Sequence, residues 1–292
     1  KWQRLLFYPT LYEGFEFSRN IIYTGAAPNQ NSAQLADYMT RRFGVRVYLI
    51  GSDYIYPYES NRIMSDFIYE RPGGTKLAER YVRLDATQQE FLTIARDIKD
   101  KQPDFVFSTV VGRGTQLLYR AYAEVGLDPA KMPIASLRTC EAEVSEMGLG
   151  IAAGHITAAP YFQSVANHIN SDCLARFRNF GRGEVEPNMC WEAAYFQVHM
   201  FANAMRHSGS DEIDTLLPYL LGSEFDAPQG RVRIDPSNHH TRLYPRIGRV
   251  GDDGHFAIVA ESLVGVDADP YLVHHSVEER RAPHAETGDA GA

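Results

Sequence analysis

The sequence predicts an α/β fold, because short apolar strands alternate with amphipathic helices over the first half of the chain. Alternation of this kind is typical of βαβ units and a parallel sheet. The chain has 292 residues, of which 44% are hydrophobic. That is enough for one large or two medium globular units with real cores.

The periodicity of apolar residues gives the expected elements in order. Up to residue 162 we expect helices at about 31–43, 58–70, 87–101 and 113–125, and strands at about 45–51, 76–83, 104–109, 132–137 and 155–161. The rhythm then changes to consecutive helices at about 168–179, 189–207 and 211–221. Strand signals follow at 230–235, 243–249 and 254–259, with a hairpin turn at Asp252-Asp253-Gly254. Residues 276–292 are charged and small without periodicity, which predicts a disordered tail.

The composition excludes several classes of partner. The net charge is −8 and the basic residues are scattered, so the sequence shows no basic cluster that would bind nucleic acid or an anionic membrane. The longest apolar run is far shorter than a spanning helix, so we expect no membrane insertion. The chain has three cysteines with no CxxC spacing, which favours free thiols in a reducing compartment.

Clustered phenols and hydroxyls stand where two apolar strands give way to loops. Tyr8, Thr10 and Tyr12 follow one strand, and Tyr54 and Tyr56 follow another. In an open α/β sheet, ligands bind in the crevice beyond the carboxyl ends of the strands. These uncharged donors and aromatic faces suit a small neutral polar molecule, and suit a charged one poorly. The alternative is that each tyrosine is an ordinary half-buried aromatic with a solvated hydroxyl.

Other motifs are weaker. Gly112-Arg113-Gly114-Thr115 lacks a Walker lysine and a GxGxxG fingerprint, so we reject nucleotide binding, although the turn delivers Val110 to the crevice. Adjacent histidines, as in His239-His240 and His274-His275, seldom ligate one ion, so we expect no metal and no cofactor. No nucleophile elbow or paired acids at a defined spacing is present, which predicts that the protein is not an enzyme.

Five segments together resemble one family. They are residues 8–16, 27–32, 51–57, 107–112 and 225–230. They are similar to the AmiC-type amide receptors, which sense short-chain amides and restrain an antiterminator of the amidase operon. The same motifs occur in the related urea and short-chain-amide binding proteins of ABC transporters. The resemblance runs from about residue 4 to 275 and implies a type I periplasmic-binding-protein fold, with two lobes of parallel sheets flanked by helices.

The resemblance also implies a division of the chain and a set of site residues. Lobe 1 would comprise 1–28 and 162–225 and would be incomplete, since the family's N-terminal segment is missing; lobe 2 would comprise 29–161 and 226–275. Hinges are expected at 26–28, 160–162 and 225–227. Tyr8 and Thr10 would hold the ligand from one lobe, and Leu11 stands where the receptors have a proline. The residues that would close over the ligand from the other lobe are Tyr54, Tyr56 and Val110, with Thr139 nearby.

Three functions stay open at this point. The first is a cytoplasmic, non-catalytic sensor of a small amide or urea, with an antiterminator-type regulator as its partner. The second is the periplasmic substrate-binding component of a urea or amide importer, with an ABC permease as its partner. The third is an enzyme such as an amide hydrolase, against which the missing nucleophile counts. The resemblance also allows a homodimer. Asp53 could instead pair the ammonium group of an amino acid, although its position fits a loop or helix cap equally well.

Overall fold

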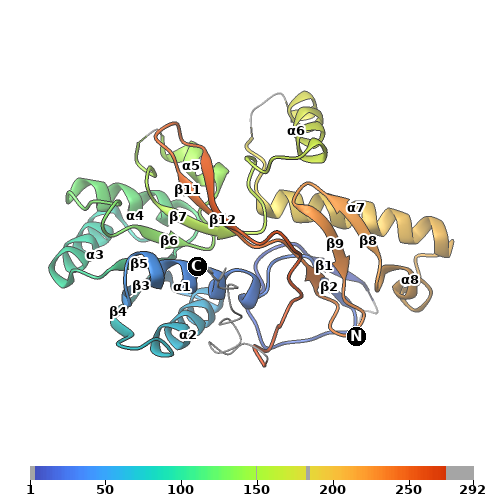
Figure 1. Cartoon of the computed structure of the whole chain (residues 1–292), viewed down its shortest axis with the longest axis horizontal. Helices are drawn as coiled ribbons and strands as arrows, with labels where there is room; N and C mark the ends of the chain where they lie inside the picture. The colour runs from blue at the N-terminus through green and yellow to red at the C-terminus, as the bar shows by residue number, and fades with distance from the viewer. Residues whose placement is uncertain (1–3, 149, 182–184, 274–292) are drawn as a thin grey trace, which may run out of the picture.

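A seven-stranded sheet forms the larger side of the molecule in the computed structural model, which describes residues 4–148, 150–181 and 185–273 (Figure 1). The strand order is β12-β11-β7-β6-β5-β3-β4. In chain order the strands are β3 (Arg46–Ser52), β4 (Thr75–Val82), β5 (Phe105–Thr109), β6 (Ile134–Ser136), β7 (Ile156–Ala159), β11 (Arg246–Val250) and β12 (Phe256–Glu261).

Strand β3 lies inside this sheet and runs parallel to both neighbours, β4 and β5. Every residue from Val47 to Ser52 is buried, because helices cover both faces of a parallel sheet. Close packing explains why residue 51, near the end of β3, is a glycine. A Cβ there would lie 2.7 Å from Pro57 Cβ and 2.6 Å from Thr109 Oγ1. The first turn of the following helix can therefore pack directly onto the strand.

Helices cover the two faces of this sheet. They are α1 (Ser32–Arg42), α2 (Ile55–Tyr69), α3 (Gln88–Lys101), α4 (Arg113–Glu124) and α5 (Glu141–Met147). Figure 1 shows α1 and α2 on one face and α3 and α4 on the other. Right-handed crossovers require this arrangement, because the chain steps from β3 to β4 in one direction and from β4 through β5 to β6 in the other.

The smaller side is built from two short sheets and three helices (Figure 1). A parallel pair, β1 (Leu6–Tyr8) and β2 (Ile21–Tyr23), lies beside an antiparallel sheet of β8 (Glu224–Ala227), β9 (Gly230–Ile234) and β10 (Thr241–Arg242). A bridge between Tyr23 and His240 joins the two sheets, and the rings of these residues stack at 4.3 Å. The helices are α6 (His168–Gly181), α7 (Met189–Ser208) and α8 (Ile213–Leu220), and a 3₁₀ turn, η1 (Pro28–Gln30), precedes α1.

The predicted α/β class is confirmed, and the expected parallel sheet needs one correction. Strand β11 runs antiparallel to both β7 and β12, so the large sheet is mixed. The β11–β12 hairpin turns at the expected Asp252-Asp253-Gly254, where Gly254 has φ +78°. The helix expected at 58–70 begins earlier, at Ile55, because Pro57 is tolerated in the first turn of a helix. Helix α5 was not expected at all.

The chain crosses between the two sides at three places in the described residues. Two of them, around 26–28 and 160–162, match expected hinges. The third expected hinge is wrong, because residues 225–227 belong to β8; the chain instead returns to the large sheet between β10 and β11, at Tyr244-Pro245. Strands β8 to β10 pack against α7 and β2, on the same side as β1. The tail expected at 276–292 lies outside the described residues.

Candidate functional site

Residues from both sides of the molecule meet beyond the carboxyl ends of β3 and β6. Arg138 follows β6, and Cys190 lies in the first turn of α7 on the smaller side. The Arg138 Nη1 atom donates a hydrogen bond to Cys190 Sγ at 3.4 Å. Asn188 fixes the start of α7, since its side chain accepts hydrogen bonds from the backbone N–H groups of Cys190 and Trp191. The two sides of the molecule therefore contact each other at the strand ends where the sequence predicts a crevice.

The smaller side contributes Tyr8, Thr10 and Leu11. The Tyr8 hydroxyl donates to Glu13 Oε2 at 2.7 Å, and its half-buried ring packs edge-on against Tyr23. Thr10 and Leu11 line a cavity that also touches Cys190 and has a volume of about 10 Å³. This is room for about one water molecule. The residues that line this cavity lie on the smaller side or, as for Ala26 and Pro160, where the chain crosses between the two sides.

Gly25 explains why the loop of Thr10 lies so close to the end of β2. A Cβ at residue 25 would lie 1.6 Å from the Thr10 carbonyl oxygen, a distance that no real side chain can occupy. The backbone N–H of Gly25 also donates to the Tyr8 carbonyl at 3.0 Å. Glycine at this position therefore holds the Tyr8 to Thr10 segment in place.

The larger side contributes Tyr54 and Tyr56, at the start of α2. Tyr54 is 36% exposed, whereas Tyr56 is 5% exposed, and their ring centroids are 6.2 Å apart. Burial raises the pKa of Tyr54; the nearby charge of Arg138 lowers it, and that of Glu13 raises it. Since Glu13 accepts from Tyr8, the phenols of Tyr8 and Tyr54 share one region between the two sides. The buried Tyr56 hydroxyl makes no hydrogen bond with any described residue.

Val110 and Thr139 lie deeper. Val110 is 1% exposed, and its carbonyl accepts from Thr115 Oγ1 at 3.0 Å. The buried Thr139 hydroxyl donates to Ser136 Oγ and accepts from the Tyr119 hydroxyl, both at 3.1 Å. Tyr54 and Tyr56 lie side by side, and Tyr54 acts electrostatically on Tyr8, whereas Thr10 and Leu11 line the small cavity on the smaller side. Val110 and Thr139 are packed among neighbours on their own side.

Sequence reasoning missed Arg138. It is half-buried and stands one residue before Thr139, in the same loop at the end of β6. Burial lowers the pKa of its guanidinium, but Cys190 and Glu143 nearby raise it more, so the net pKa is raised and the group stays charged. The signal available in the sequence was position: Arg138 follows a strand just as Tyr54 does.

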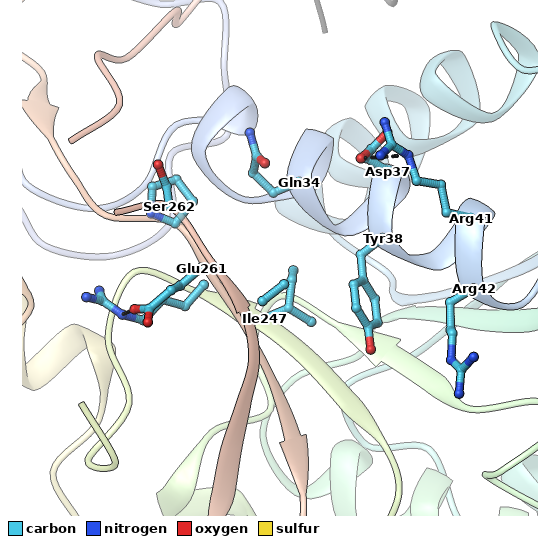
Figure 2. Close-up of a pocket in the computed structure, with 11 residues that line it drawn as sticks. Gln34, Asp37, Tyr38, Arg41, Arg42, Ile247, Glu261 and Ser262 are labelled. Carbon is cyan, nitrogen blue, oxygen red and sulfur yellow. Dashed lines mark hydrogen bonds and ion pairs between the residues drawn. The ribbon is translucent and has the colours of Figure 1, made fainter. Parts of the chain in front are cut away.

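A larger cavity lies elsewhere. It has a volume of about 550 Å³ and opens between α1 and the β11–β12 hairpin, with Tyr38 and Ile247 on its walls (Figure 2). Four of the charged side chains that line it form two ion pairs: Asp37 with Arg41 at 3.2 Å, and Arg246 with Glu261 at 3.1 Å. None of the sequence-predicted site residues lines it. We place the candidate site by its chemistry, between the two sides, and not by cavity size.

Two buried carboxyl groups, those of Glu141 and Glu192, have raised pKa values. The Glu141 side chain, at the start of α5, accepts from the backbone N–H of Gln163 at 2.7 Å, and burial raises its pKa to about 7. Glu192 on α7 accepts from Gln229 Nε2 at 2.7 Å, and burial raises its pKa to about 7 as well. No group of three His, Cys, Asp or Glu side chains with metal-binding geometry occurs in the part of the chain that the structure describes. Within the same residues, no helix has the length and apolarity needed to cross a bilayer.

Comparison with known proteins gives one family match. The profile of the periplasmic binding protein domain matches residues 1–277. Among curated proteins, a stretch of 133 residues is 30% identical to a protein named limonene hydroxylase from Geobacillus stearothermophilus, covering 45% of this chain. That stretch spans 24% of the relative's length.

Solved structures share the fold. A solute-binding protein of an ABC transporter from Rhodopseudomonas palustris, in complex with 3,4-dihydroxybenzoic acid, is 21% identical, with a TM-score of 0.76 over 86% of this chain and 69% of that one. An amino-acid ABC transporter substrate-binding protein from Pseudomonas fluorescens is 15% identical, with a TM-score of 0.75 over 90% and 72% of the two chains. At these identities the likeness establishes the fold alone.

Proposed function

Because the chain belongs to the periplasmic binding protein domain family, whose members are ligand-binding rather than catalytic domains, we propose that it is a receptor for one small polar solute. The solute binds between the smaller side, at Tyr8 and Thr10, and the larger side, at Tyr54, Tyr56 and Arg138. The protein binds this solute without transforming it.

One observation carries this proposal: hydrogen-bond donors from both sides converge where the Arg138 guanidinium touches Cys190. A solute that bridges the two sides stabilises the closed arrangement more than the open one, and such a differential affinity is what a receptor of this fold needs.

A short-chain amide or urea is the solute that the sequence motifs suggest. The phenols of Tyr8 and Tyr54 and the Thr10 hydroxyl can each donate or accept a hydrogen bond, as an amide requires. In this role the protein is a cytoplasmic regulator of amidase expression, with an antiterminator-type protein as its partner. A ligand of only about four heavy atoms gains at most about 6 kcal/mol, so its dissociation constant lies on the order of tens of micromolar.

The alternative role is the substrate-binding component of an importer. The structural neighbours of this chain from Rhodopseudomonas palustris and Pseudomonas fluorescens are named as ABC transporter binding proteins, which supports this role. The protein then acts outside the cytoplasmic membrane and delivers its solute to a permease.

Thermal unfolding with a panel of solutes tests the proposed receptor function. A solute that binds the folded protein raises its melting temperature by mass action. We expect at least one small amide, urea or small carboxylate to do so, and a Tyr54→Phe variant to respond less. A panel that leaves the melting temperature unchanged, together with no binding by calorimetry, would contradict the proposal.

A further inference from the structure

Arg138 is a charged side chain whose setting the proposed function does not yet explain. Resting on that function, we infer that the solute carries a carboxylate group, which binds to the Arg138 guanidinium and the Tyr56 hydroxyl. This narrows the receptor's solute from any small polar molecule to a small carboxylic acid in its ionised form. The neutral amides expected from the sequence then bind more weakly than their matching acids.

The guanidinium of Arg138 has no anionic partner. Among residues 4–148, 150–181 and 185–273, no carboxylate lies within ion-pair distance of it. Its hydrogen bond goes to the Cys190 sulfur, a weak acceptor, and burial raises the pKa of that thiol, which favours the neutral form. Leaving a half-buried charge uncompensated is costly unless a partner arrives.

Other buried arginines in the same protein show the contrast. Arg246 is 6% exposed and pairs with Glu261 at 3.1 Å. Arg71 pairs with Asp37 at 3.0 Å. Glu143 is the carboxylate whose charge raises the pKa of Arg138. Its Oε2 atom already accepts hydrogen bonds from the Cys140 backbone N–H at 3.1 Å and from the Cys140 thiol at 2.6 Å. Arg138 alone of these three arginines is left for an external anion.

The Tyr56 hydroxyl is the second, independent observation. It is buried and makes no hydrogen bond of normal geometry with any described residue; the Ser60 hydroxyl, one turn along α2, interacts with it weakly and lowers its pKa. The charges that act on this phenol are Arg138 and Tyr54 on its own side and Cys190 on the opposite side. Tyr56 therefore lies at the boundary where the two sides meet, beside the unpaired guanidinium.

The donor set of this cluster matches a carboxylate and mismatches an amide. A guanidinium offers a planar fork of N–H donors and no acceptor, and the phenol offers one O–H donor. A carboxylate presents only acceptors and satisfies both groups together. A primary amide presents one acceptor oxygen, and its NH₂ group would face the N–H donors of Arg138. On opening, a solute carboxylate replaces the Cys190 sulfur as the partner of Arg138.

Isothermal titration calorimetry with matched acid and amide pairs tests this inference. The probes are sodium benzoate against benzamide and sodium acetate against acetamide, titrated into the full chain at neutral pH. We expect an acid to bind more tightly than its amide. Arg138→Gln should weaken binding of the acid by about 10- to 100-fold, the worth of a charge-assisted hydrogen bond. Arg138→Lys should retain part of the affinity, because it keeps the charge but loses the fork.

Two further variants complete the test. Tyr56→Phe should weaken binding of the acid about fivefold, and more than it weakens binding of the matching amide. Arg120→Gln, which removes an exposed guanidinium on α4, should change neither affinity. Circular dichroism and melting curves establish that each variant is folded. Tight binding of an amide that is unaffected by Arg138→Gln would overturn the inference and leave the receptor function standing. Binding of neither acids nor amides would overturn both.

Discussion

The Nη1 atom of Arg138 lies 3.4 Å from the Sγ atom of Cys190, and this hydrogen bond joins the loop after β6 to the first turn of α7. A thiol is a poor partner for a guanidinium, so the contact is easily exchanged for a better acceptor. We propose that the carboxylate of a solute replaces this thiol. The same pair marks a point where the two sides of the molecule meet.

We expect Tyr54→Phe to weaken solute binding by about 1 kcal/mol, the usual net worth of a neutral hydrogen bond. Tyr54 is exposed enough to reach a solute, and the charges of Arg138 and Glu13 both act on its phenol. Calorimetric titration of the variant measures the loss. Tyr69→Phe, at the exposed end of the same helix, is the matched control. Equal affinities in wild type and Tyr54→Phe would place Tyr54 outside the site.

Gly25→Ala should destabilise the protein strongly and displace the segment that carries Thr10. The added Cβ would lie 1.6 Å from the Thr10 carbonyl oxygen, so the backbone must move. Overpacking of this kind costs about 1–3 kcal/mol or more. Urea unfolding gives the change in free energy of unfolding. Gly181→Ala, where the nearest atoms would be 4.0 Å away, is the control and should be close to neutral. A wild-type midpoint for Gly25→Ala would refute the close packing.

The free energy of unfolding should fall as the pH rises through about 7. Burial raises the folded-state pKa of Glu141 and Glu192 to about 7, above the usual value for glutamate. A carboxyl group with a raised pKa contributes stability that is complete below its unfolded pKa and is lost as the pH rises through the folded one. Buried His155 and His240 oppose this at lower pH, because burial lowers the pKa of each to about 3.

Between about pH 6.5 and 8.5 the two carboxyl groups lose their protons in the folded state, while the histidines of the unfolded state lose their remaining ones. Comparison of the wild type with a variant that keeps the same histidines therefore isolates the carboxyl contribution. Glu141→Gln keeps an acceptor for the backbone N–H of Gln163 and should flatten the dependence of melting temperature on pH. Glu124→Gln, at an exposed position, should leave the dependence as it is. A wild-type protein whose stability rises over this range would contradict the assignment.

Much of the large sheet could be predicted from the sequence, because a buried parallel strand such as Arg46–Ser52 is a continuous apolar run and its helices show clear periodicity. The direction of β11 could not be predicted from the sequence, since the polarity of a strand in a sheet depends on the path of the chain and not on the local residue pattern. Helix α5 is too short to show a period. Tyr8, Thr10, Tyr54 and Tyr56 could be proposed from their positions after strands, and Leu11 from the family resemblance. Arg138 could not, because what distinguishes it is the lack of an ion-pair partner among the described residues.

The amide-sensing role makes a separate expectation about partners. A regulator of this kind should co-purify from native lysate with an RNA-binding protein, in amounts that change when a small amide is added, because a ligand acts only through its differential affinity for two states. Recovery of permease subunits, with no such regulator under either condition, would assign the protein to the importer role.

Hydrogen–deuterium exchange on the full chain with a bound solute tests the central claim most directly. We expect slower exchange of the backbone amides in residues 8–13, 53–58, 137–141 and 189–192, which come from both sides of the molecule. The cavity between α1 and the β11–β12 hairpin, at Tyr38 and Ile247, should show no change. Protection confined to that cavity, with unchanged exchange around Tyr54 and Arg138, would contradict binding between the two sides.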